Sequence, residues 1–171
     1  MIHPQLLFAV ITNQSGLDRL RNKRFMSNTL ISNSIRKNRR ILGALGEQLA
    51  RRHLEQKGFA HIASNYLKKY GELDLIMEFH GKLHFVEVKT VSREIKQIEG
   101  KYVIHETLED YSAEENLSIR KLKRIARVIP VYLEETKQTD SEWTFDAVLV
   151  YLDRKKAKAL VKIIKDIPLH R

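Results

Sequence analysis

The chain has 171 residues, 43% of them hydrophobic, which is enough for one core of ordinary size. It contains no cysteine, so disulfide frameworks, thiolate metal sites and cysteine nucleophiles are excluded. Its formal charge of +10 favours polyanionic partners, although many basic proteins simply carry solvated lysines. The apolar run Leu6 to Ile11 is too short for a signal-peptide core or a membrane span. We therefore expect a cytoplasmic protein with no membrane partner.

Residues 1–38 differ from the rest of the chain. They contain six basic residues and one acidic residue, are rich in Ser, Asn and Thr, and show no sustained apolar period. This composition predicts a mobile basic arm that contacts phosphates, followed by one domain over residues 39–171. Two alternatives stay open: a targeting-like leader, or an upstream extension with the natural start at Met26.

The first predicted helix spans residues 39–57. Apolar residues recur at helical spacing from Leu42 onward, and Gly58 supplies a stop. Gly43 and Gly46 lie inside this helix, where each costs about 1 kcal/mol relative to alanine. We therefore expect another part of the protein to approach the helix backbone closely at these glycines.

The remaining elements give an α/β chain in the order α-β-β-β-α-β-β. Three runs rich in β-branched and aromatic residues predict an antiparallel meander, a charged stretch predicts a long loop, and a 3.6-residue apolar period predicts a second helix before a final hairpin. In chain order, these are strands 59–67, 72–79 and 82–88, loop 91–115, helix 117–135, and strands 143–151 and 157–164.

The strand over residues 82–88 contains the first chemical signal. Leu83, Phe85, Glu87 and Lys89 alternate, so their side chains project from the same face. Burying an unpaired charge costs several kcal/mol, so a glutamate and a lysine at the end of an apolar strand face require mutual pairing or a ligand.

Asp74 on the preceding strand is the candidate third partner. Pairing across the tight turn places it opposite His84 to Glu87, depending on register. Two carboxylates and the carbonyl of Val88 offer the oxygen ligands that Mg²⁺ prefers. Lys89 is then placed to orient or deprotonate an attacking water and to neutralise charge at phosphorus. Together these groups indicate phosphodiester hydrolysis.

Several ordered motifs resemble those of the YraN-like bacterial family, which belongs to the PD-(D/E)XK restriction-endonuclease-like superfamily and is similar to archaeal Holliday junction resolvases. The resemblance covers residues 43 to about 150 and leaves out the arm. The motifs are Gly43-Ala-Leu-Gly46-Glu47-Gln-Leu-Ala50, Asn65-Tyr66, Gly71-Glu72-Leu73-Asp74-Leu75-Ile76, Phe85-Val86-Glu87-Val88-Lys89, Ser118-Ile-Arg-Lys121-Leu-Lys-Arg124-Ile125 and Phe145-Asp146-Ala147-Val148.

The resemblance implies a restriction-endonuclease-like fold with a mixed central sheet flanked by helices. It implies that Asp74 and Glu87 are metal ligands, that Lys89 is the signature lysine, and that Glu47 is a helix acid facing the same cleft. Lys121 is implied to be a basic helper that reaches a phosphate or a site carboxylate. The implied protein is a Mg²⁺- or Mn²⁺-dependent endonuclease acting on DNA, with branched or single-stranded DNA as candidate substrates and, by analogy with the resolvases, a homodimer.

The sequence departs from the superfamily pattern in three places. Leu73 stands where the superfamily name expects proline, and the basic residue commonly found two positions after the signature lysine is missing, with Arg93 as the nearest substitute. The insert from Glu94 to Glu115 is long for the family, which puts substrate access in question.

Alternatives accompany each of these assignments. Glu47 could instead pair with Arg51 four positions later on the helix. Basic residues on the second helix either contact phosphates or form a solvated face; the nucleic-acid-binding candidates are Lys121, Arg120, Arg124, Arg127 and Arg93. For the whole chain, the rivals are a non-catalytic nucleic-acid-binding protein that retains the nuclease fold, and a scaffold that binds a protein through residues 91–115.

Overall fold

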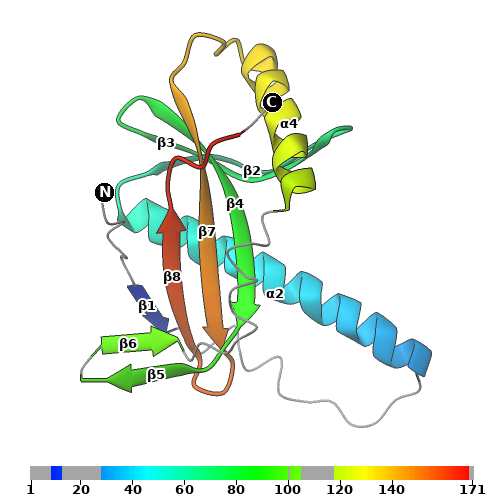
Figure 1. The fold of residues 1–171 in the computed structure, drawn as a ribbon, viewed down its shortest axis with the longest axis vertical. Coiled ribbons are helices and arrows are strands. Elements are labelled where there is room, and N and C mark those ends of the chain that lie inside the picture. The colour runs from blue at the N-terminus through cyan, green and yellow to red at the C-terminus, as the bar shows by residue number, and fades with distance from the viewer. Residues whose placement is uncertain (1–8, 13–27, 100, 105–117, 170–171) are drawn as a thin grey trace.

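The computed structural model describes residues 9–12, 28–99, 101–104 and 118–169, and these form two helices and eight strands (Figure 1). In chain order the elements are β1 (Ala9–Thr12), α2 (Asn28–Gln56), β2 (Ala60–Lys68), β3 (Gly71–Phe79), β4 (Lys82–Ser92), β5 (Ile95–Ile98), β6 (Lys101–Ile104), α4 (Ile119–Glu135), β7 (Trp143–Asp153) and β8 (Lys158–Ile164). Neither described helix is long and apolar enough to cross a membrane.

The central sheet has six strands in the order β1-β8-β7-β4-β3-β2. β4 and β7 pair in parallel, whereas the other neighbours pair antiparallel, so the sheet is mixed. The predicted α/β class, the mixed sheet flanked by helices, the meander and the final hairpin are all confirmed. His80 and Gly81 join β3 to β4 with positive φ angles of 52° and 77°, as a two-residue hairpin turn requires.

The two helices cover opposite faces of the sheet, and α2 passes behind it in Figure 1. Alternation along β4 separates the faces, because Val86 packs with the residues of α2 and Phe85 packs with those of α4. The α2 side includes Leu49, Ala50, Leu54, Leu75, Met77 and Val148, and the α4 side includes Ile125, Val128, Ile129, Leu83 and Phe145. Each helix therefore packs on one face of the sheet through the apolar residues along one side of the helix.

The hairpin β5–β6 covers the part of the α4-side face that α4 does not reach. Ile95 of this hairpin is buried against Leu149 and Tyr151 of β7, with Val91 of β4 packed against the same cluster. Along one face of β4, Phe85 therefore lies under α4 and Val91 lies under the hairpin. Glu87 and Lys89 alternate onto this face between the two apolar covers.

The loop predicted for residues 91–115 is wrong in its first half. β4 continues to Ser92, and residues 95–98 and 101–104 form β5 and β6. These strands have only four residues each, with lysine and glutamine among the apolar positions, so the sequence shows neither a long apolar run nor a sustained alternation. The second half of the predicted loop lies outside the described residues, apart from the end of β6.

The first helix begins earlier than predicted, at Asn28 instead of residue 39. Its first part is rich in Ser, Asn and Thr, which are weak helix formers, so the propensity signal there is poor. Part of the segment expected to be an arm therefore belongs to α2, and β1 pairs with β8. The rest of that segment lies outside the described residues.

The two helix glycines have different surroundings. A side chain at Gly46 would overlap the hydroxyl of Thr90 on β4, so the expected close approach is confirmed there. At Gly43, no described residue beyond the helix's own backbone lies within 4 Å of the position that a side chain would take, so the described part of the chain shows no close approach there. Gly46 thus sets the distance between α2 and the strand that carries Glu87.

Candidate active site

Asp74 and Glu87 come together where β3 and β4 separate. The paired positions of the two strands end at Leu75 and Val86, which makes Asp74 and Glu87 the next residues on each strand. The Oδ2 atom of Asp74 accepts a hydrogen bond of 2.8 Å from the backbone N–H of Val88. Asp74 is buried. Its carboxylate thus accepts the hydrogen bond of a β4 N–H group at a point where the β3 backbone no longer pairs with β4.

Glu87 is held in an environment that disfavours its charge. Its side chain is 12% exposed, and burial together with the neighbouring Asp74 raises its pKa from 4.5 to about 7. The ammonium of Lys121 lies 3.1 Å from Oε2 and partly offsets this rise. Oε2 nevertheless has no hydrogen-bond partner among the described residues, so the contact is an ion pair without a well-formed hydrogen bond.

Lys121 reaches this pair from the first turn of α4. Ser118 caps the helix by accepting a hydrogen bond of 3.2 Å from the backbone N–H of Lys121, which fixes where the side chain starts. Burial alone would lower the pKa of Lys121, but the charges of Glu87 and Asp74 outweigh it and the pKa is raised. Of its two implied partners, phosphate or site carboxylate, the structure shows Lys121 with the carboxylate.

Glu47 enters the same electrostatic environment from α2. Burial raises its pKa, a hydrogen bond of 3.2 Å from the Asn65 amide opposes the rise, and the charges of Asp74 and Glu72 add to it. Arg51, the partner that the alternative gave to Glu47, pairs instead with Glu55 at 2.8 Å.

Asn65 also belongs to this site, although no role for it was predicted from the sequence. It has a positive φ of 54° inside β2, a conformation that asparagine adopts more readily than most side chains. Asparagine is also depleted in strands, so its presence inside a predicted strand was a usable signal.

Lys89 is exposed and follows Glu87 by two residues on β4. Alternation places both on the same strand face, and the β7 neighbour of Lys89 is the buried Leu149. The amine is therefore open to an incoming molecule, whereas the ammonium of Lys121 is committed to Glu87.

The predicted nucleic-acid-binding residues fall in two places. Arg120, Arg124 and Arg127 are exposed residues of α4, and the Cβ of Arg124 lies close to Gly71 at the start of β3. Arg93 lies at the far end of β4, next to the turn between β7 and β8. The predicted basic residues thus form two separate groups, one on α4 and one at the end of β4.

The donor set at the carboxylates suits a small divalent cation. The described residues contain no cluster of three or more Asp, Glu or His side chains that could bind a metal. Mg²⁺, however, is usually held by one or two carboxylates together with waters and substrate oxygens. Asp74, Glu87 with its buried Oε2, and the Val88 carbonyl form a set of that kind.

Fold and site together define a class: a mixed α/β domain with two like-charged carboxylates and two lysines where its central strands separate. Comparison with known proteins then gives the family. The model of the Uncharacterised protein family UPF0102 matches residues 46–150, and the chain belongs to this family, which is the YraN family. The resemblance seen in the sequence motifs is therefore confirmed, and Glu47, Asp74, Glu87, Lys89 and Lys121 all lie within the matched range.

Three bacterial relatives show how much of the chain is shared, and each carries only the description UPF0102 protein. The protein of Pelotomaculum thermopropionicum is 34% identical over 118 residues, 68% of this chain and 86% of the relative. Those of Syntrophomonas wolfei and Herpetosiphon aurantiacus are both 32% identical, over 70% and 68% of this chain and 91% and 86% of their own lengths.

Proposed function

We propose that this protein is a divalent-cation-dependent endonuclease that hydrolyses phosphodiester bonds of DNA, with branched or single-stranded DNA as its candidate substrates. The observation that carries the proposal is the juxtaposition of Asp74 and Glu87 beside the exposed Lys89. Two acids held together repel each other, and a divalent cation held by Asp74 and Glu87 would remove that repulsion.

Asp74, Glu87 and the Val88 carbonyl would hold Mg²⁺ or Mn²⁺. The chemistry supplied by such a cation is Lewis acidity toward a phosphate oxygen. A cation requires ionised ligands, so the raised pKa of Glu87 makes cation affinity increase as the pH rises through about 7.

The chain's own side chains have separate roles in this proposal. Lys89 neutralises the negative charge that builds up on the phosphate as water attacks phosphorus and the bond to the leaving oxygen breaks. Lys121 holds Glu87 in place and limits its repulsion with Asp74. Glu47, oriented by Asn65, adds a further carboxylate at the edge of the site and acts as a positioning residue.

A cleavage assay tests the proposal. End-labelled linear, flapped and four-way DNA, together with single-stranded RNA, are incubated with the full chain and Mg²⁺ or Mn²⁺, or with EDTA. We expect cation-dependent cleavage of DNA that falls by about 10²–10³-fold in Glu87→Gln and Lys89→Met. Lys137→Gln, which changes an exposed lysine after α4, is the matched control and should cleave normally. Full activity in the two site variants would identify a contaminating nuclease.

A second candidate function rests on the ion pair between Lys121 and Glu87. Since a protein cation already partners one of the two acids, the chain is also a candidate for a nucleic-acid-binding protein without turnover. That protein would bind DNA or RNA in a salt-sensitive way, unaffected by EDTA and by Asp74→Ala. Binding near background would instead favour the scaffold alternative.

A further inference from the structure

The turn between β2 and β3 carries side chains that neither the core nor the turn itself explains. Lys68 pairs with Gly71, so Lys69 and Tyr70 form the whole turn, although two-residue hairpin turns favour Asn, Asp and Gly. Tyr70 is 45% exposed, and Leu67 near the end of β2 is 70% exposed. Neither belongs to an apolar cluster of the described residues. The tip of this hairpin therefore presents apolar surface to solvent.

The β2–β3 hairpin is held against α4 at two points. Glu135, the last residue of α4, accepts hydrogen bonds of 2.6 Å from the Tyr66 hydroxyl and 2.6 Å from the Lys68 ammonium. On the other strand, a Cβ at Gly71 would lie only 3.2 Å from the Cβ of Arg124, so the glycine allows a close approach. The turn thus has a defined place, and the hairpin extends past α4 in Figure 1.

The first turns of α4 connect this hairpin with the candidate active site. Lys121 reaches Glu87, and Arg124 lies against the start of β3. Residues three positions apart are neighbours on a helix surface, about 4.5 Å apart along the axis. Glu72, two residues after the turn, contributes by its charge to the raised pKa of both Lys121 and Glu47. The turn therefore lies next to the carboxylates.

Basic side chains surround the exposed ring. The ammonium of Lys69 lies 5.4 Å from the ring centroid of Tyr70, and α4 adds the exposed Arg120, Lys123 and Arg124. Proteins that bind unpaired nucleotides combine basic groups along the phosphate backbone with aromatic rings on which the bases stack. The charge next to the apolar tip therefore complements a polyanion with aromatic bases.

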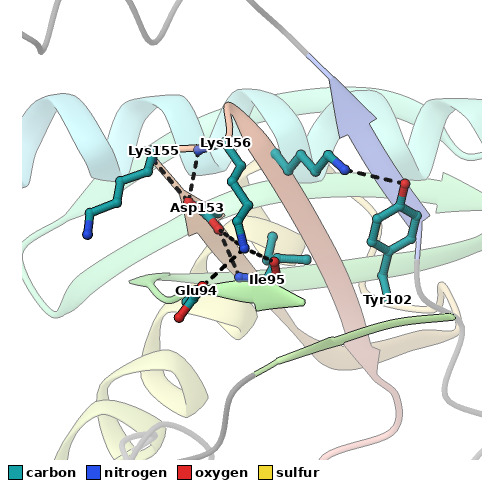
Figure 2. A network of polar contacts seen from close by, with 7 residues as sticks. Glu94, Ile95, Tyr102, Asp153, Lys155 and Lys156 are labelled. Atoms are coloured by element: carbon teal, nitrogen blue, oxygen red, sulfur yellow. Dashed lines mark hydrogen bonds and ion pairs between the residues drawn. The ribbon is translucent and has the colours of Figure 1, made fainter. Parts of the chain in front are cut away.

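Tyr102 on β6 shows how a tyrosine of the fold itself differs. It is half-buried and packs on the cluster that contains Ile95 and Leu149. The ammonium of Lys158 lies 4.7 Å from its ring centroid and donates a hydrogen bond of 3.5 Å to its hydroxyl (Figure 2). Packing thus explains Tyr102, whereas the exposed ring of Tyr70 has no such role in the described part of the chain.

We propose that Tyr70 stacks on an unpaired base of the DNA strand that the carboxylate site holds, while Lys69 and Arg124 contact the neighbouring phosphates. The proposal rests on the proposed function, because that site is the other contact point of the strand. The Cα atoms of Tyr70 and Asp74 are at most about 14 Å apart, a distance that a few nucleotides span. A base within a duplex must first be unstacked at a cost, so the tip favours single-stranded and branched DNA.

The test compares DNA bases with a bare backbone and needs no cleavage. A fluorescein-labelled thymidylate dodecamer, and an abasic dodecamer of the same charge, are titrated with the full chain in EDTA and followed by fluorescence anisotropy. Tyr70→Leu keeps the apolar bulk without the ring, and Tyr70→Phe keeps the ring. The matched control is Ile98→Ala, which changes an exposed apolar residue at the tip of the β5–β6 hairpin.

We expect the unmodified chain to bind the thymidylate strand about tenfold more tightly than the abasic strand. Tyr70→Leu should lose this preference and bind the abasic strand as before, whereas Tyr70→Phe and Ile98→Ala should keep the preference. A fully paired twelve-base-pair duplex should be bound equally by the unmodified chain and by Tyr70→Leu, because it offers no unpaired base.

Three results would overturn the proposal: no measurable binding of the thymidylate strand, equal binding of the two strands by the unmodified chain, or an unchanged preference in Tyr70→Leu. A dimer in sedimentation experiments that Tyr70→Leu dissociates would assign the tip to a second copy of the chain and overturn it as well. A preference that depends on Tyr70 in a chain that cleaves nothing would support the stacking site while contradicting the nuclease. Cation-dependent cleavage without that preference would do the reverse.

Discussion

β4 takes part in two polar pairs that differ in charge. His84 pairs with Asp146 of β7 at 2.7 Å, and Asp146 also accepts a hydrogen bond of 2.9 Å from the backbone N–H of Asp166. Glu87 lies beside Asp74 of β3, and the ammonium of Lys121, 3.1 Å from its Oε2, does not form a well-aligned hydrogen bond with it. The first pair joins an acid to an imidazole, whereas the second joins two acids.

The two pairs differ in whether the fold alone explains them. Buried polar groups are normally satisfied by the protein, so the pair of His84 and Asp146 is explained by the fold alone. The pair of Asp74 and Glu87 is not, because its repulsion remains after folding and Lys121 offsets only part of it. Such an incompletely satisfied pair is a candidate site for an external cation.

The largest expected difference between the pairs is in catalysis. Asp74→Asn should slow cation-dependent DNA cleavage by about 10²–10³-fold, because it removes a charged ligand while keeping the side-chain shape. Asp146→Asn, assayed well below its melting temperature, should stay within about threefold of the unmodified chain. Similar losses in both variants would contradict the separation of the two pairs.

The effects on stability should have the opposite order, with a larger loss on substitution of Asp146 than on substitution of Asp74. Asp146→Ala should lower the free energy of unfolding by about 3 kcal/mol, because His84 and a backbone N–H lose a buried partner. Asp74→Ala should change it by about 1 kcal/mol or less in EDTA, since the lost bond from Val88 is offset by relief of repulsion with Glu87. Urea unfolding of both variants measures the difference, and a larger loss for Asp74→Ala would break the comparison.

The pH dependence of stability should identify Glu87. Its folded pKa of about 7 lies above the ordinary 4.5, so the folded chain holds a proton that the unfolded chain releases. The resulting stability is fully present below pH 4.5 and is lost as the pH rises through 7. In EDTA, Glu87→Gln should therefore gain about 2 kcal/mol relative to the unmodified chain between pH 5 and pH 8.

Mn²⁺ provides the control for this measurement. Added at pH 8, it should stabilise the unmodified chain against urea and leave Glu87→Gln unaffected, because a bound cation replaces the missing proton. If the difference in free energy of unfolding between the unmodified chain and Glu87→Gln did not change with pH, Glu87 would ionise normally.

The smallest effect concerns the edge of the site. Glu47→Gln should reduce cleavage by about tenfold through weaker cation affinity, whereas Arg51→Ala should leave cleavage unchanged because Arg51 pairs with the exposed Glu55. Calorimetric titration with Mn²⁺ would show whether cation affinity changes in the first variant. Unchanged affinity would confine the site to β3 and β4.

The sequence predicted the parts of the site that depend on local pairing. The turn at His80 and Gly81 sets the register of β3 and β4, and that register alone puts Asp74 next to Glu87. The prediction that Glu87 and Lys89 share one face of the strand required only the two-residue repeat of a β-strand.

The parts that depend on packing between distant elements could not be predicted in the same way. The bond from Asn65 to Glu47 joins β2 to α2, and no spacing along the chain implies it. Arg93 lies beside the β7–β8 turn, some 60 residues away along the chain, because β4 pairs in parallel with β7. The spacing of apolar residues along the sequence indicates which face of the sheet a side chain lies on, but it does not indicate which strand lies next to it.

The tight turn between β3 and β4 also bears on the order of assembly. Asp74 and Glu87 are 13 positions apart on one hairpin, whereas the parallel partners Val86 and Asp146 are 60 positions apart. Closing the short loop costs less entropy, so we expect a nascent chain to bring the two acids together before β7 has been synthesised. During synthesis, Asp74 and Glu87 would therefore come together first, and His84 would pair with Asp146 only after β7 had been made.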